Sequence, residues 1–145
     1  MTVSLPALRR LSLFVVAAAA IAHCALAALP PSAYQADQDQ APEALIIKVL
    51  SVDVKVSKSF TETVTTVRAR ARVEEVKRTA SDLKPGAEID IAYTNVELKR
   101  DKGLVGPSSY IPVLEDGTTV PAFVSGNQQT GYLPAARVYS FTEIR

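Results

Sequence analysis

Three arginines at alternate positions are the residues of this sequence whose spacing most readily suggests chemistry. Arg68, Arg70 and Arg72 lie in the run VRARARV. On a strand, alternate side chains project from one face about 7 Å apart, close to the phosphate spacing of a nucleic-acid strand. They are therefore candidates for an anion-binding or partner-binding site. No aromatic residue separates them, and acidic residues on neighbouring segments are available as cross-strand partners, which favours a solvated, charge-paired face: Glu62, Glu74, Glu88 and Asp90.

The side chains that most enzymes use as nucleophiles or metal ligands are almost absent. The chain of 145 residues has one histidine, His23, and one cysteine, Cys24. Both precede the cleavage site argued below, so the exported protein would have no imidazole or thiol for a catalytic triad or a zinc site. The sequence predicts no catalytic residue, no cofactor and no metal site. A small hydrolase that uses carboxylate or tyrosine residues is the enzymatic alternative.

Residues 1–27 contain the three parts of a secretory signal peptide. Arg9 and Arg10 supply positive charge, an uncharged apolar run of about 12 residues follows, and Ala25 and Ala27 place small residues where signal peptidase reads. We expect cleavage between Ala27 and Ala28 and a periplasmic or secreted protein. Because the apolar run is shorter than the roughly 20 residues that span a bilayer, we expect no membrane span after cleavage.

Two other interpretations of this segment stay open. The apolar run could be retained as an anchor, or Cys24 could be lipidated, although His23 stands where a lipobox has a small residue. Cleavage would remove Arg9 and Arg10 and leave 14 basic residues against 15 acidic ones, so the charge of the exported chain would be close to zero. A chain without a net positive field is an improbable nucleic-acid binder.

The remainder divides into a short leader, residues 28–43, and one domain, residues 44–145. The leader ALPPSAYQADQDQAPE has three prolines and no apolar periodicity, so we expect it to be flexible and dispensable for folding. The composition changes at Ala44, and Val52, Val54 and Val56 alternate with Asp53 and Lys55, which predicts a first strand from Ala44 to Val56.

A long second strand follows, within residues 62–79. Its alternation slips by one position after Glu74, which indicates a β-bulge. Pro85 and Gly86 predict a type II turn, and a third strand begins near Ile89. These features predict a bent sheet that can close on itself.

Turn signals divide the C-terminal third. Residues 99–109 are expected to form a loop, residues 111–125 a hairpin turning at Gly117, and residues 138–144 a last strand. Pro121 requires an edge or a bulge because it cannot donate to a ladder. The aromatic side chains of this region are expected mostly in the core rather than in a groove. The fold class is therefore all-β, with five strands.

The long kinked second strand and the Pro-Gly turn into the third resemble an OB-like barrel. The run VRARARVEEVKRTASDLKPGAEIDIAYT is similar to the matching hairpin of netrin-like modules. The resemblance covers about 50 residues and implies a small five-stranded barrel. Netrin-like domains carry disulfides and usually a C-terminal helix, which are both missing from this sequence, so an inhibitory function is not implied.

Taken together, these features favour a non-catalytic periplasmic or secreted binding module. An OB-like barrel would recognise a protein or an oligosaccharide through its sheet face and loops. The carboxylate or tyrosine hydrolase and the anion-binding module built on Arg68, Arg70 and Arg72 are the alternatives.

Overall fold

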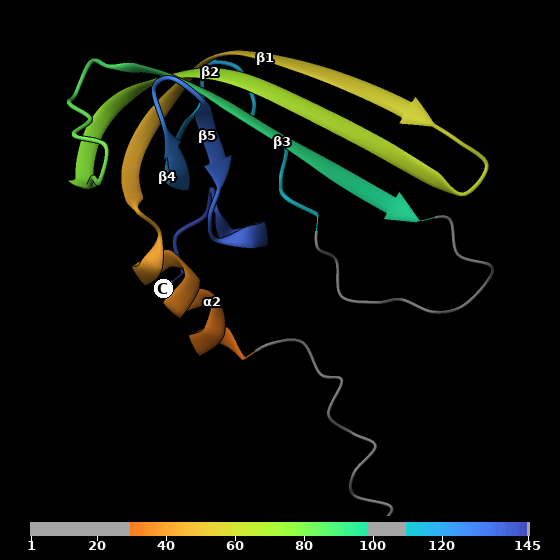
Figure 1. Ribbon diagram of the computed structural model, residues 1–145, viewed down its shortest axis with the longest axis horizontal. Helices are drawn as coiled ribbons and strands as arrows, with labels where there is room; N and C mark the ends of the chain where they lie inside the picture. Colours follow the sequence, from red (N-terminus) through yellow and green to blue (C-terminus); the bar gives the residue numbers. More distant parts are fainter. Residues whose placement is uncertain (1–29, 99–109, 145) are drawn as a thin grey trace, which may run out of the picture.

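The chain folds into a closed barrel of five strands (Figure 1). The computed structural model describes residues 30–98 and 110–144. The predicted signal peptide, its cleavage site between Ala27 and Ala28, Cys24 and the predicted loop 99–109 lie outside the described residues. The elements are α2 (Pro31–Gln40), β1 (Glu43–Lys58), β2 (Glu62–Arg78), β3 (Glu88–Leu98), β4 (Thr119–Asn127), β5 (Gly131–Pro134) and the short 3-10 helix η1 (Arg137–Tyr139).

The strand order around the barrel is β1-β2-β3-β5-β4, and β4 closes the ring on β1. All pairs are antiparallel except β3 with β5, where Ile91 faces Tyr132 in parallel register. The prediction of an all-β fold with a closed five-stranded barrel is confirmed, and such a barrel is consistent with the predicted OB-like type. Among the described residues, no helix has both the length and the apolar character needed to cross a membrane.

The period-two alternation of the sequence decides which side chains fill the barrel. Val67, Ala69, Ala71 and Val73 of β2 are buried, whereas the arginines between them are exposed. The core is completed by side chains from the other four strands, two connecting segments and the turn after η1: Leu45, Ile47, Val49, Leu83, Ile89, Ile91, Tyr93, Leu114, Ala122, Val124, Tyr132 and Phe141.

Bulges bend the first two strands. Ile46 pairs with Glu75 and Ile47 with Val73, so Glu74 is the extra residue and the predicted bulge is confirmed. A second irregularity lies in β1 between Val49 and Ser51. Because an extra residue bends a strand and increases its twist, these positions let β1 and β2 curve around the core.

The turn predicted at Pro85 and Gly86 is present. The Ala87 amide donates to the Lys84 carbonyl at 3.0 Å, and Gly86 has a φ of +90°. A positive φ at this position is what a type II turn requires and what glycine tolerates. The Gly86 amide also donates to the Val73 carbonyl at 2.7 Å, which holds the turn against β2.

β1, β2 and β3 extend beyond the barrel as a three-stranded ribbon (Figure 1). β4 pairs with β1 only over Glu43–Lys48. We call residues 51–58 of β1, with the parts of β2 and β3 beside them, the arm. Several large apolar side chains are exposed on it, including Val54, Val56, Val96 and Leu98, and Phe60 is exposed at its tip.

Within the leader that was predicted to be flexible, residues 31–40 form a helix, α2. Pro31 occupies the first helical position, where its missing amide is not needed. Gln38 is buried, and its side-chain amide donates to the carbonyls of Tyr139 at 2.9 Å and Thr142 at 2.6 Å. Specific polar contacts with a distant segment stabilise this helix, and apolar periodicity cannot reveal them.

The predicted last strand, residues 138–144, was also wrong. That segment contains η1 and a turn, and the fifth strand is instead Gly131–Pro134. The Ser140 hydroxyl accepts from the Ala136 amide at 3.0 Å and donates to the Arg137 carbonyl at 2.7 Å, which stabilises the turn. Phe141 packs into the core from this turn. The spacing of Tyr139 and Phe141 matched the two-residue period of a strand, which led to the wrong prediction.

The predicted hairpin over residues 111–125 formed only its second arm. Residues 111–114 run extended along side chains of β3 rather than as a strand. Asn95 exchanges two hydrogen bonds with the backbone of Ile111, and the Tyr93 hydroxyl donates to the Pro112 carbonyl at 2.7 Å. In β4, Pro121 pairs with Ile46 but lies before the residues that pair with β5, as its missing amide requires.

Candidate binding groove

A groove of about 550 Å³ lies on the outer face of the barrel. It crosses the middle of β1 and β2 and the first half of β3, and it is bordered by β5 and the end of the β4–β5 loop. This arrangement brings together four segments that are far apart in the sequence. We call it the outer groove, and it is lined by Ser51, Val52, Asp53, Arg68, Ala69, Arg70, Asp90, Ile91, Ala92, Thr130, Gly131, Tyr132 and Leu133.

The three predicted arginines project from one face of β2, but they differ in their partners. Arg70 Nε lies 3.1 Å from Asp90 Oδ1, and Arg72 Nε lies 3.4 Å from Glu74 Oε1. The hydrogen bond that Arg70 donates to Asp90, and then the negative charge of Asp90, raise the pKa of Arg70. These pairs are solvent-exposed, so each is worth little to stability.

Arg68 is the exception among the three. It faces Asp53 across the β1–β2 ladder, yet Asp53 makes its ion contact with Lys55 at 3.9 Å. No ion pair joins Arg68 to any residue in 30–98 or 110–144. Arg68 and Arg70 line the outer groove and Arg72 does not. Among the described residues, the guanidinium of Arg68 is therefore the arginine group of the groove that can form a new ion pair with a ligand.

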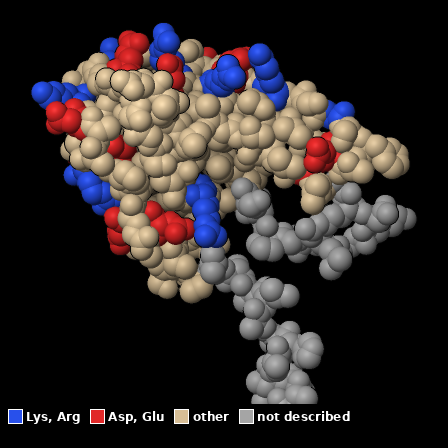
Figure 2. All heavy atoms as spheres, in the orientation of Figure 1, with Lys and Arg blue, Asp and Glu red and all other residues tan. Residues whose placement is uncertain are grey.

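The surface charge is mixed rather than of one sign. Figure 2 shows basic and acidic side chains side by side along the upper edge of the molecule. Within the groove, Asp53 and Asp90 accompany Arg68 and Arg70. A long polyanion would meet these carboxylates as well as the arginines, which lowers the attraction of the surface for it.

Close backbone contact positions the β4–β5 loop at the border of the groove. Gly126 has a φ of +143°, and a Cβ placed there would lie 2.1 Å from the Gly131 carbonyl oxygen. In the loop, Asn127 Oδ1 accepts from the amides of Gln129 and Thr130, both at 2.9 Å. A side chain at position 126 would push the loop away, so the border of the groove depends on glycine.

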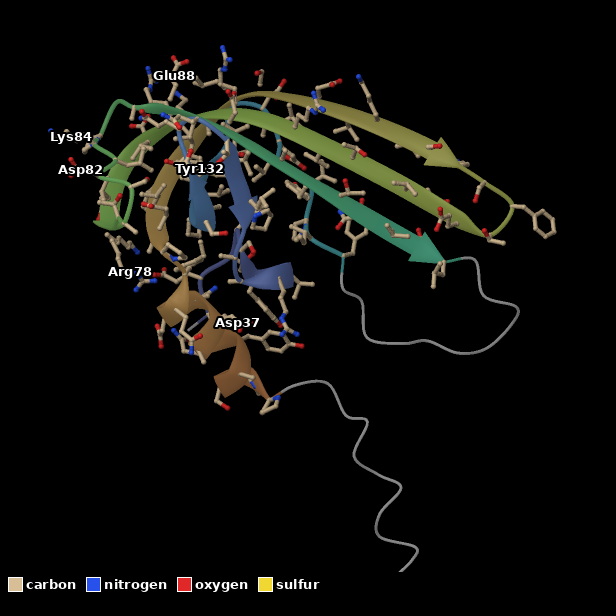
Figure 3. All side chains as sticks on the ribbon, viewed as in Figure 1. Asp37, Arg78, Asp82, Lys84, Glu88 and Tyr132 are labelled. Atoms are coloured by element: carbon tan, nitrogen blue, oxygen red, sulfur yellow. The ribbon has the colours of Figure 1, made fainter. Side chains whose placement is uncertain are left out.

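Tyr132 is the aromatic residue among the groove-lining positions, and it is not available for stacking. Its side chain is buried, and its hydroxyl lies 2.8 Å from Ser81 Oγ. Figure 3 shows Tyr132 inside the barrel. Other C-terminal aromatic side chains pack similarly: Phe141 lies 5.7 Å from Tyr93 between ring centroids, and Tyr139 lies 4.8 Å from Tyr34. Tyr110, by contrast, is exposed.

A polar cluster at the opposite end of β1 was not anticipated. Glu43, assigned to the leader by its sequence, is fully buried, and its Oε1 accepts from the amides of Ala80 and Ser81 at 3.1 and 2.8 Å. Arg78 donates to the carbonyls of Gln38 and Ala41, and Figure 3 shows it beside α2. These contacts join α2 to the barrel. The sequence signal was weak, because a charged residue between a proline and a strand is usually solvated.

The arginines were identifiable from sequence, whereas the rest of the groove was not. Ser51, Thr130 and Gly131 join Arg68 because strand order places the β4–β5 loop beside β3. Within the described parts of the chain, no cluster of three or more acidic, histidine or cysteine side chains could hold a metal ion. Comparison of the chain with protein-family models, curated proteins and solved structures finds no match. The function of the chain is therefore inferred from the outer groove.

Proposed function

We propose that this chain is an exported, non-catalytic binding module that recognises a protein segment through the outer groove. The observation that carries the proposal is the exposed guanidinium of Arg68, without an ion-pair partner among the described residues, in a groove bordered by the β4–β5 loop. OB-like barrels use the face of their second and third strands and the loops beside it for binding. Export is inferred from the signal-peptide features of residues 1–27.

The lining of the groove favours a protein over an oligosaccharide. Barrels of this type that bind sugars or bases present aromatic rings for stacking. In the outer groove the aromatic ring is that of Tyr132, which is buried and hydrogen-bonded to Ser81. Backbone edges, hydroxyl groups and charges make up the accessible surface, and these groups complement an extended peptide.

The charge pattern favours a single carboxylate as the anchor of that peptide. Arg70 and Arg72 already contact carboxylates of this chain, so Arg68 is the arginine of the stripe that can bind a carboxylate of the ligand. A guanidinium can bind a carboxylate through two parallel hydrogen bonds. Asp53 and Asp90 at the groove would repel a second acidic side chain placed near them. We therefore expect a ligand with one acidic residue among neutral or basic neighbours.

A peptide selection followed by calorimetry tests this proposal. Peptides selected from a random 10-residue display library against the exported protein should contain an acidic residue. Arg68→Gln should weaken binding of a selected peptide about 10- to 100-fold, since a hydrogen bond to a charged group contributes roughly 1.5–3 kcal/mol. Arg72→Gln is the matched control, because it removes an arginine of the same stripe outside the groove, and it should change affinity less than about threefold.

Heparin separates this proposal from the anion-binding alternative. If the three arginines bound a polyanion, the protein would be retained on heparin at about 50 mM salt, and retention would fall steeply with salt. We expect no retention. Strong retention that is lost in the triple Arg68→Gln, Arg70→Gln, Arg72→Gln variant would replace the peptide proposal with the anion-binding one.

A further inference from the structure

The second half of β1 has an open edge. β4 pairs with β1 up to Lys48, and the Val49 amide donates to the Thr118 carbonyl at 2.8 Å. Beyond that point, over residues 51–58, the described residues pair with β1 only through β2. Figure 1 shows β1 as the outermost strand of the arm. An exposed strand edge is a template for pairing with another strand.

The hydrogen-bond pattern decides which residues of β1 point their backbone groups outward. The Ser59 amide donates to the Glu62 carbonyl at 2.8 Å, so this is a hydrogen-bonded pair of the antiparallel ladder. Such pairs alternate along a ladder, so Asp53, Lys55 and Ser57 bond to β2. The amides and carbonyls of Val52, Val54 and Val56 therefore face the open edge.

The side chains of these valines add an apolar strip to the open edge. Val54 pairs with Val67, whose side chain is buried, so the valines project from the same sheet face as the core. Val54 is nevertheless 43% exposed and Val56 56% exposed. Asp53 and Lys55 alternate with them and project from the opposite face.

We propose that two copies of this chain pair edge to edge through β1, antiparallel, with Val54 on the two-fold axis. In this register Val54 meets Val54 of the second copy, and Val52 meets Val56 of the second copy. These pairs are hydrogen-bonded and give about six backbone hydrogen bonds. Asp53 then lies opposite Lys55 of the second copy in the closer, non-hydrogen-bonded position, where opposite charges are favourable.

Charge selects this register over its neighbours. A shift of one strand by one residue would place backbone groups that face the open edge opposite groups that bond to β2. The allowed registers therefore differ by two residues. Moving the axis to Asp53 places the two Asp53 side chains directly opposite each other, and moving it to Lys55 does the same with the two lysines. Like charges in that position are destabilising. Of these three registers, the one with Val54 on the axis is the one that places opposite charges face to face, so it makes the segment self-complementary, as a two-fold interface requires.

Sedimentation velocity on the exported protein tests the proposal. We expect a dimer that dissociates in the micromolar range, because a single strand edge buries less surface than a standard interface. Asp53→Lys and Lys55→Asp should each weaken the dimer about tenfold or more. The double exchange should restore the wild-type dissociation constant to within about threefold, because the exchanged charges again face each other. Lys84→Asp and Asp116→Lys make the same charge changes in exposed turns and should leave the dimer unchanged.

Val54→Pro tests the backbone component. The Val54 amide does not bond to β2, so a proline there leaves that ladder intact and removes the donor on the two-fold axis. The variant should be monomeric while its circular dichroism spectrum stays that of the wild type. A wild-type protein that stays monomeric at several hundred micromolar would overturn the proposal. So would a dimer that the double charge exchange fails to restore.

Discussion

The two halves of β1 are both rich in apolar residues but have different environments. Val49 in the first half is fully buried, and the strand there has partners on both edges. Val56 in the second half is more than half exposed, and its strand has a partner on one edge. Apolar and polar residues alternate in the second half, whereas the first half is a nearly continuous apolar run. The difference arises from the length of β4 and from the bulge at Leu50, so alternation predicts the faces of a strand and not whether anything covers them.

Truncation of these two valines is expected to give the largest difference in the free energy of unfolding. Val49→Ala should lower the free energy of unfolding by about 2–3 kcal/mol, because it removes two buried methyl groups and leaves a cavity. Val56→Ala removes the same atoms from a mostly exposed position and should cost less than about 1 kcal/mol. Urea unfolding at low micromolar protein measures both. Equal losses would mean that the arm is covered in solution.

A substitution in α2 tests how much the polar contacts between this helix and the barrel contribute to stability. Gln38→Ala removes both hydrogen bonds to the Tyr139 and Thr142 carbonyls and should cost about 1–3 kcal/mol. Gln40→Ala changes the same residue type at an exposed position of the same helix and should be nearly neutral. Thermal melting of both variants is sufficient. If Gln38→Ala melts with the wild type, α2 does not contribute to stability and the leader is dispensable after all.

The smallest expected effect is the contribution of Tyr93 to the pH dependence of stability. Tyr93 lies where the closed barrel meets the arm. Burial raises the pKa of Tyr93 to about 12, which the Leu114 amide partly opposes. The unfolded chain releases this proton near pH 10, so the folded state binds it more tightly. Its contribution to stability is complete below about pH 10 and is lost as the pH rises toward 12, by about 2 kcal/mol at most. Tyr93→Phe should unfold with a flatter pH dependence over that range, and an unchanged profile would contradict the role of burial.

The alternation in residues 44–98 was enough to predict three strands, the bulge at Glu74 and the turn at Gly86. Each depends on local rules: the two-residue period of side chains, a one-residue slip and the positive φ that glycine allows. The arginine stripe was visible for the same reason. The segments whose structure was predicted wrongly from the sequence are those whose conformation depends on contacts with distant residues.

What the sequence determined by itself is therefore the set of central strands, their inward and outward faces, and the signal-peptide features of residues 1–27. Only the tertiary structure decided that residues 31–40 are a helix, because Gln38 requires carbonyls about 100 residues away. It also decided that Gly131–Pro134 is the fifth strand, since a four-residue strand has too little periodicity to be recognised and forms by pairing with β4 and β3. The outer groove and the open edge of β1 follow from that same closure. Strand order places the β4–β5 loop beside Arg68, and because β4 is short, Val54 pairs with β2 alone among the described residues.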